Sequence, residues 1–173
     1  MSVQTKSQRL FFALWPDNKV RKAISAVGKR AAQQHQGRLV ATDNLHLTLS
    51  FLGNVSNSQR DCIGRLAESI SITPFSLCLE HLGVFPRARV LWLGIKEQPN
   101  PLKQLAARLD KGARDCGIQL ADQGFTPHVT LMRKVNQLHE FEVEPIHWDV
   151  NQFCLVQSVS HPQGVEYRVL KIW

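Results

Sequence analysis

The sequence of 173 residues contains no stretch of roughly 18 consecutive apolar residues, the length that a membrane-spanning helix requires. Near the N-terminus the apolar run is only LFFALW, and Pro16 and Asp17 end it. This run is too short for the core of a secretory signal peptide, and no small-residue cleavage site follows it. We therefore expect a cytoplasmic protein that does not associate with membranes.

Motifs of several enzyme classes are also missing. The sequence has no HExxH, no CxxC and no cluster of carboxylates, so neither a zinc site nor a two-metal site is expected. It also has no Walker loop, no GxGxxG and no GxSxG, the motifs that bind nucleotides or position a catalytic serine. Any catalysis is therefore expected to need neither a metal ion nor another cofactor.

Cysteine is scarce and scattered. The four cysteines are Cys62, Cys78, Cys116 and Cys154. In a chain of this size without a signal peptide, we expect free thiols rather than disulfides. Cys62 and Cys116 fall in predicted helices, and the other two fall in predicted strands.

Acidic residues are outnumbered by basic ones. The chain has 21 Lys and Arg against 14 Asp and Glu, a formal net charge of +7 with neutral histidines. An excess of this sign favours a polyanionic partner, most commonly a nucleic acid. Because there is no long run of Lys and Arg, any basic surface has to be assembled by folding.

The apolar patterns predict strands and helices in the order β-α-β-α-β-β-α-β-β-β. The predicted strands cover 9–15, 44–55, 74–85, 89–95, 127–133, 151–160 and 165–173, and the predicted helices begin at Asp17, at the Ser56–Gln59 capping box and at Asn100. Residues 134–149 are expected to form a long loop. This order predicts an α+β fold with mixed strand directions, and no Gly/Ser linker divides the chain, so residues 1–173 are expected to form a single domain.

One predicted strand carries polar residues inside an apolar run. In NLHLTLSFLGNV the alternation of a strand places His46, Thr48 and Ser50 on one face, and the leucines and Phe51 on the other. The apolar face is suited to the core. The polar face must contact water, a hydrogen-bond network or a ligand.

A second copy of this pattern lies about half the chain further on. The segment TPHVTLMRKV repeats the H-x-T-L spacing at His128 and Thr130. The five other histidines do not show it. The repeat predicts an old duplication, with two lobes that each contribute one strand whose histidine faces a shared cleft.

Two imidazoles with nearly ordinary pKa values can serve as general base and general acid near neutral pH. Such a pair suits in-line displacement at phosphorus without a metal ion. One histidine takes the proton of the attacking oxygen, and the other gives a proton to the leaving oxygen. Thr48 and Thr130 can donate hydrogen bonds to the non-bridging oxygens, where negative charge builds up.

Both motifs resemble the signature motifs of the 2H phosphoesterase superfamily. HLTLSFLG and HVTLMR are most similar to those of bacterial RNA 2′,3′-cyclic phosphodiesterases, historically named 2′–5′ RNA ligases. The segments RLFFALWP, TDNLHLTLSFLGNV, RVLWLG and FTPHVTLMR are similar to that family as well. The resemblance covers essentially the whole chain.

This resemblance implies a bilobal α+β fold, with pseudo-twofold duplicated lobes, outer helices and a central basic cleft. It implies metal-independent opening of a 2′,3′-cyclic phosphate at an RNA end, which leaves a 2′-phosphate. In that reaction His46 is the proton donor to the 3′-oxygen, His128 is the proton acceptor from water, and Thr48 and Thr130 bind the phosphate. The implied partners are RNA with 2′,3′-cyclic phosphate ends, such as tRNA fragments, or cyclic nucleotides. A monomer is expected, because one chain carries both halves of the site.

Arg133 follows the second motif and is the candidate cation for phosphate or the RNA backbone. Simple alternation puts it on the face opposite His128, so this role requires the strand to end or bulge nearby. The first motif has Phe51 at the aligned position, and the site is therefore only approximately symmetric. Arg87 and Arg89 are further candidates for contact with the RNA backbone, and no aromatic residue is assigned to base stacking.

Two other functions remain open. A 5′-hydroxyl can replace water as the attacking group, which would make the protein a 2′–5′ RNA ligase that joins tRNA halves. Alternatively, the chain can be a non-catalytic RNA-end binder that retains the fold. The second alternative is disfavoured by the intact H-x-T pairs, because binding alone needs cationic residues rather than two titrating ones.

Overall fold

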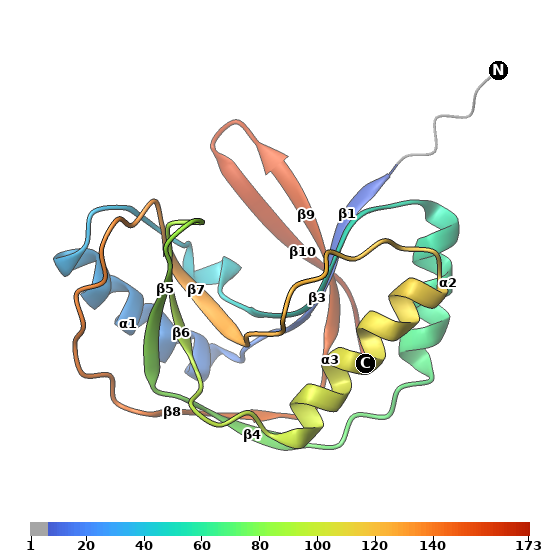
Figure 1. The fold of residues 1–173 in the computed structure, drawn as a ribbon, viewed down its shortest axis with the longest axis horizontal. Helices are drawn as coiled ribbons and strands as arrows, with labels where there is room; N and C mark the ends of the chain where they lie inside the picture. The colour runs from blue at the N-terminus through green and yellow to red at the C-terminus, as the bar shows by residue number, and fades with distance from the viewer. Residues whose placement is uncertain (1–6) are drawn as a thin grey trace.

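Residues 7–173 are described by a computed structural model, drawn in Figure 1. Residues 1–6, which begin the segment considered above as a signal peptide, lie outside the described residues. The strands are β1 (Gln8–Leu14), β2 (Arg38–Leu39), β3 (Leu47–Val55), β4 (Phe75–Leu79), β5 (His81–Phe85), β6 (Val90–Gly94), β7 (His128–Arg133), β8 (Ile146–Val150), β9 (Cys154–His161) and β10 (Gly164–Ile172). The helices are α1 (Asn18–Gln34), α2 (Asn57–Glu68) and α3 (Asn100–Asp115), and η1 (Thr42–Asn44) is a 3₁₀ turn.

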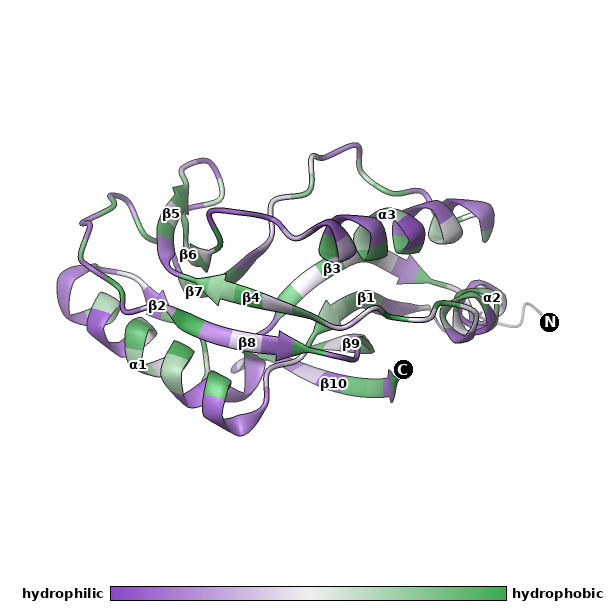
Figure 2. Ribbon diagram, turned by 90° about the horizontal axis from the view of Figure 1, so that it is seen from below, coloured by the Kyte–Doolittle hydropathy of each residue, from purple (hydrophilic) through white to green (hydrophobic). Residues whose placement is uncertain are grey.

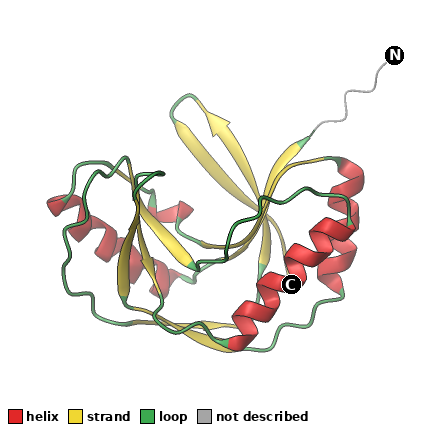
Figure 3. Cartoon of the chain, viewed as in Figure 1, coloured by secondary structure: helices red, strands yellow, loops and turns green. Residues whose placement is uncertain are grey.

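Eight of these strands form one sheet in the order β10-β9-β1-β3-β7-β6-β5, with β2 paired to β7. The other two, β4 and β8, form a separate two-stranded sheet. Every strand pair within residues 7–173 is antiparallel, so the expected mixture of strand directions is not found. The predicted α+β class is confirmed, with the helices on the outside of the sheets (Figure 3).

The first strand occupies the central position that its composition predicts. β1 pairs with β3 on one side and β9 on the other, and its residues from Leu10 to Leu14 are all buried. A strand that is apolar on both faces must be covered on both faces, and these side chains of β1 are buried on both. The two strands that carry the H-x-T motifs, β3 and β7, are neighbours in the same sheet.

Two predictions about strands are wrong in the same region. Residues 74–85, predicted as one strand, form β4 and β5, which turn apart at Glu80 and pair with β8 and β6 respectively. The partner β8 lies inside 134–149, which was predicted to be a loop throughout. Apolar alternation predicts that residues are extended, but it does not show where an extended segment leaves one sheet for another.

The helix termini agree with the capping signals in the sequence. The Asp17 side chain accepts a hydrogen bond from the Val20 N–H at 2.8 Å, and Ser56 and Gln59 form the predicted capping box. Gly117 follows α3 with a φ of 75°, a left-handed conformation that glycine adopts at little cost. All three helices combine hydrophilic and hydrophobic residues, as Figure 2 shows and as partly buried helices require. Within residues 7–173, no helix is long and apolar enough to cross a membrane.

The helices cross over between the two motif strands. α1 precedes β3 in the chain but packs against β7, whereas α3 precedes β7 but packs against β3 (Figure 1). Each half of the molecule therefore uses a helix from the other half of the sequence. This exchange joins the lobes through packing as well as through the shared sheet.

The expectation of free thiols is wrong for one cysteine pair. Cys62 of α2 and Cys116, directly after α3, form a disulfide with their Cα atoms 5.8 Å apart. The pairing depends on α2 and α3 lying side by side, which their separation in the sequence does not reveal. Cys78 and Cys154 are free, as predicted.

Candidate active site

The two H-x-T motifs meet at the contact between β3 and β7. Leu47, the middle residue of the first motif, is paired with Val129, the middle residue of the second. Both side chains are fully buried in the core. The strands are antiparallel, so the motifs run in opposite directions on either side of this pair, related by a local twofold axis. Alternation then directs the histidines and threonines of both motifs away from the core.

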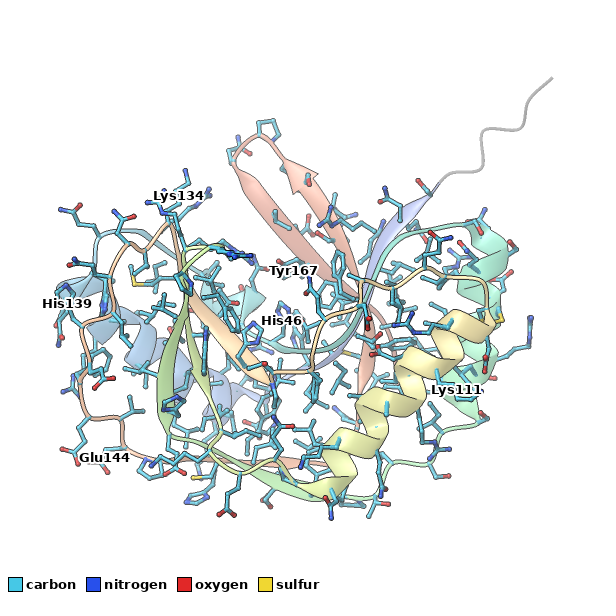
Figure 4. The ribbon with its side chains drawn as sticks, in the orientation of Figure 1. His46, Lys111, Lys134, His139, Glu144 and Tyr167 are labelled. Carbon is cyan, nitrogen blue, oxygen red and sulfur yellow. A yellow bond between two sulfur atoms is a disulfide. The ribbon has the colours of Figure 1, made fainter. Side chains whose placement is uncertain are left out.

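These side chains face a groove of about 980 Å³, and all five predicted site residues line it. Figure 4 shows His46 and Tyr167 between β7 on one side and the β9–β10 hairpin on the other. The groove is lined by His46, Thr48, His128, Thr130 and Arg133, together with residues that include Arg9, Phe11, Arg38, Asn44, Phe51, Phe85, Glu166 and Tyr167. The structure thus brings together residues from both halves of the chain.

A bulge in β7 places Arg133 in the groove. In the pairing with β6, Leu91 is opposite Met132 but the next residue, Trp92, is opposite Thr130, so Leu131 is an extra residue. An extra residue reverses the alternation of side chains beyond it. Arg133 therefore lies on the groove side with Thr130, as the predicted role of Arg133 requires.

A corresponding bulge in β3 corrects the predicted faces of that strand. Phe12 is opposite Ser50 but Ala13 is opposite Thr48, which leaves Leu49 as the extra residue. Ser50 therefore turns away from the groove, where its hydroxyl donates a hydrogen bond to Asp110 of α3. Phe51, predicted to face the core, lines the groove instead and is 50% exposed.

Both histidines are oriented by the same hydrogen bond. The Nδ1 atom of His46 lies 2.7 Å from the carbonyl oxygen of Asn44, and that of His128 lies 2.7 Å from the carbonyl oxygen of Thr126. A carbonyl can only accept, so Nδ1 carries the proton in each ring. In the neutral rings Nε2 is left with a lone pair, and this is the atom that can exchange a proton with a ligand.

His46 is enclosed by aromatic rings. Trp15 stacks on it with ring centroids 5.5 Å apart and planes 9° apart, while Phe11 and Tyr167 lie at 4.9 Å and 5.0 Å. Its Nε2 atom also lies 3.1 Å from the Thr48 hydroxyl oxygen. The ring is thereby fixed in position and largely removed from water.

This enclosure lowers the pKa of His46 from 6.5 to about 4. Burial is the main cause, because it disfavours the charged imidazolium. The hydrogen bond to the Asn44 carbonyl acts in the opposite direction, and the positive charges of His128 and Arg133 lower the pKa further. Without a bound anion, His46 is therefore neutral near pH 7.

His128 lies in more open surroundings. Phe85 meets its ring edge-on at 4.9 Å, and Trp92 lies at 6.0 Å. Burial lowers the pKa of His128, the hydrogen bond to Thr126 opposes this, and the charge of Arg133 adds to the lowering. The charge of Arg133 thus lowers the pKa of both histidines.

Phosphate chemistry fits this arrangement. A bound anion between the two rings would favour their protonated forms, so one histidine can become charged while the other keeps its lone pair. Threonine hydroxyls and a guanidinium nearby can bind the non-bridging oxygens. Among residues 7–173, no group of three or more His, Cys, Asp or Glu side chains is arranged to hold a metal ion.

Several groove residues were not predicted from the sequence. Arg9 of β1 lies over the Phe51 ring at 5.0 Å, and so supplies a cation where the first motif lacks its own arginine. Arg38 and Tyr167 reach the groove from β2 and β10. None of these residues stands in a recognisable motif, because their position depends on which strands are neighbours. Arg87 and Arg89, by contrast, do not line the groove, and Arg89 donates to the Lys134 carbonyl at 3.2 Å.

Comparison with known proteins gives one consistent result. Residues 16–162 match the family model described as the 2′-5′ RNA ligase superfamily. The chain is 35% identical over 171 residues to the RNA 2′,3′-cyclic phosphodiesterase of Escherichia coli K12, covering 98% of this chain and 97% of the relative. A protein of the same description from Archaeoglobus fulgidus is 28% identical over 176 residues, covering 95% and 99%.

A solved structure agrees over the same length. The fold superimposes on the crystal structure of E. coli LigT complexed with 3′-AMP with a TM-score of 0.87 and 36% identity. The alignment covers 97% of this chain and 98% of that one.

Proposed function

The chain belongs to the 2′-5′ RNA ligase superfamily, and on this premise we propose that it is an RNA 2′,3′-cyclic phosphodiesterase, a hydrolase of the cyclic phosphate at RNA ends. The observation that carries the proposal is the pairing of Leu47 with Val129, which sets the two H-x-T motifs around one groove. Full-length relatives described as RNA 2′,3′-cyclic phosphodiesterases support it.

In the proposed mechanism, His128 removes a proton from water through Nε2 as the water oxygen attacks phosphorus. The bond from phosphorus to the 3′-oxygen breaks, and His46 gives its Nε2 proton to that oxygen. The products are a 3′-hydroxyl and a 2′-phosphate. The shared orientation of the two rings supports these roles, since both present Nε2 while Nδ1 is held by a carbonyl.

His46 needs a proton to act as the donor, although its lowered pKa keeps it neutral near pH 7 when no anion is bound. The negative charge of the bound cyclic phosphate opposes the effect of burial and favours the imidazolium. Trp15 supports the same state, because a cation over the face of an indole ring is stabilised. Proton uptake by His46 is therefore coupled to substrate binding.

The remaining predicted residues have supporting roles in this mechanism. Thr48 and Thr130 donate hydrogen bonds to the non-bridging oxygens, and Arg133 balances the charge that develops on them. Removal of one such donor from an oxyanion site typically costs about 10²–10³ in kcat.

The test is turnover of an oligonucleotide with a 2′,3′-cyclic phosphate end in excess EDTA, with phosphorus NMR of the product. We expect hydrolysis to a 2′-phosphate and its loss in His46→Ala and His128→Ala. His147→Ala is the matched control, because that histidine is exposed on β8 and does not line the groove. Activity that requires a metal ion, or a 3′-phosphate product, would contradict the mechanism.

We also propose that the protein acts as a cytoplasmic monomer on RNA ends and on 2′,3′-cyclic nucleotides. A groove built by one chain supports the monomer, and light scattering coupled to gel filtration measures the oligomeric state. An RNA partner is supported by the net charge of +7.

A further inference from the structure

Two arginines stand directly opposite each other on neighbouring strands at one end of the groove. Arg38 of β2 is paired with Arg133 of β7, and both side chains are exposed and line the groove. Like charges in this position destabilise a sheet. Within residues 7–173, no ion pair joins either arginine to a carboxylate. Such a pair is suited to an anionic ligand that the protein itself does not supply.

The backbone is shaped to bring these arginines together. Gly37 has a φ of 150°, and a Cβ atom at this position would lie 2.6 Å from the Arg133 carbonyl oxygen. Only glycine permits β2 to approach β7 this closely. The opposition of Arg38 and Arg133 is therefore a defined feature of the fold and not a chance meeting of flexible side chains.

Arg38 is also held in place from the other side of the groove. Its Nη2 atom donates to the Gln163 carbonyl at 3.0 Å, at the tip of the β9–β10 hairpin. Asn44 fixes the same hairpin by donating to the Val165 carbonyl at 2.8 Å. The hydrogen bond from Arg38 to Gln163 uses one of the five N–H groups of the guanidinium, so the others are available to a ligand.

Among the described residues 7–173, the one carboxylate that lines the groove already has hydrogen-bond donors. Glu166 accepts hydrogen bonds from Arg168 at 2.8 and 2.9 Å and from His161 at 2.9 Å. It therefore does not neutralise Arg38 from across the groove.

The two arginines stand on different strands at the same end of the groove. The charge of Arg133 lowers the pKa of both motif histidines. Arg38 belongs to β2, which is paired with β7 at Met132 and Arg133, beyond the Leu47–Val129 pair where β3 contacts β7. A groove of about 980 Å³ also exceeds what a single cyclic phosphate and its ribose can fill.

We propose that Arg38 binds the internucleotide phosphodiester on the 5′ side of the terminal nucleotide, while Arg133 serves the cyclic phosphate. This inference rests on the proposed function and specifies its substrate as a polynucleotide end. Arginine suits the role, because its planar fork can hold two phosphate oxygens at once.

The test compares two dinucleotides that end in a 2′,3′-cyclic phosphate. One has a natural phosphodiester between its nucleosides, and the other has an uncharged methylphosphonate. The measured quantity is the ratio of kcat/KM for the charged substrate to kcat/KM for the uncharged one. We expect a ratio of at least about 10 for the unaltered protein, as for a charge-assisted hydrogen bond.

In Arg38→Gln we expect this ratio to fall about tenfold, and in Arg38→Lys to fall by less, because the charge is kept. Arg114→Gln removes an exposed arginine of α3 outside the groove and should keep the ratio of the unaltered protein. The slope of log kcat/KM for the charged dinucleotide against log salt should become shallower by about 0.7 in Arg38→Gln. Thermal unfolding of each variant confirms that it is folded, and Arg38→Lys tests the inference if Arg38→Gln does not fold.

An unchanged ratio in folded Arg38→Gln overturns the inference, as does a ratio near one in the unaltered protein. Failure of the proposed function is a different result, since the unaltered protein would then hydrolyse neither dinucleotide. In that case calorimetry measures the dissociation constants of the charged and uncharged 2′-phosphate dinucleotides. The ratio of these constants then replaces the ratio of the kcat/KM values. A tenfold loss of the ratio in Arg38→Gln would still support the subsite.

Discussion

His46, directly before β3, and His128, the first residue of β7, occupy equivalent places beside the Leu47–Val129 pair, and each directs its Nδ1 proton to the carbonyl two residues earlier. Their surroundings are nevertheless different. Three aromatic rings enclose His46, and its pKa falls to about 4, whereas His128 has two aromatic neighbours and lies nearer to solvent. The motif alone therefore sets the orientation of each ring, while residues from other strands set its proton affinity.

The two halves also differ in how they are held together. On the β3 side, a disulfide joins α2 to the end of α3, and Ser50 binds Asp110 of α3. On the β7 side, α1 packs against the strand, and within residues 7–173 no disulfide braces that half. The half that encloses its histidine more completely is thus also the half with covalent support.

The largest expected effect comes from removing either histidine. We expect His46→Ala and His128→Ala each to lower kcat by about 10²–10⁴, since each would lose one proton transfer. A substrate whose 3′-oxygen is replaced by sulfur separates the two roles, because a thiolate leaves without protonation. With this substrate, we expect the kcat of His46→Ala to exceed the kcat of His128→Ala by at least about tenfold. Equal restoration, or restoration of His128→Ala alone, would reverse or remove the assignment of acid and base.

Opening the disulfide tests the difference in support between the halves. The double variant Cys62→Ser/Cys116→Ser should lower the free energy of unfolding by about 4 kcal/mol, because it frees a long loop in the unfolded chain. Urea unfolding measures the change. A reducing agent should produce the same loss in the unaltered protein and none in the double variant. Equal stability of the oxidised and reduced proteins would show that packing of α2 on α3 suffices.

The low pKa of His46 predicts a dependence of stability on pH. Between pH 6.5 and about 4, the unfolded chain binds a proton at this histidine and the folded protein does not. The free energy of unfolding should therefore fall by roughly 3 kcal/mol as the pH drops through this window. Urea unfolding at several pH values measures the slope, which should be shallower in His46→Gln. His128 acts in the same direction, so some slope remains in that variant.

The smallest effect concerns the ring that stacks on His46. Trp15→Ala opens the enclosure to water and should raise the pKa of His46 toward 6.5. Trp15→Leu keeps the imidazole of His46 covered but loses the indole face that stabilises the imidazolium. This variant should therefore lower the pKa of His46 further. Proton NMR of the histidine Cε1–H during a pH titration measures both. Shifts of the same sign in the two variants would show that one effect alone acts.

Much of the site follows from the sequence, but the faces of its strands do not. The H-x-T repeat predicts His46, Thr48, His128 and Thr130 at one cleft, and these residues line one groove. The bulges at Leu49 and Leu131 are not visible in the pattern, because a bulge changes the phase of a strand without changing its composition. The predicted face of Phe51 was therefore wrong, and that of Arg133 required a condition that the sequence could not establish.

Long-range pairing accounts for the other differences. Cys62 meets Cys116 only because two helices are neighbours, and Arg9 reaches Phe51 only because β1 is paired with β3. β8 was missed because a short strand with polar residues on one face resembles a loop when its partner is unknown. Local signals such as caps and apolar periods are contained in a single segment, and those were the reliable ones.

The pairing of Leu47 with Val129 has an evolutionary consequence. Two strands related by a twofold axis are what a homodimer of half-length chains would present, each subunit giving one histidine to a shared site. In such an ancestor both histidines would have had identical neighbours and identical proton affinities. Fusion of two such copies into one chain would remove that constraint, and in this protein Trp15 and Tyr167 contact the His46 imidazole. Division of labour between acid and base is, in this view, a benefit of having both copies on one polypeptide.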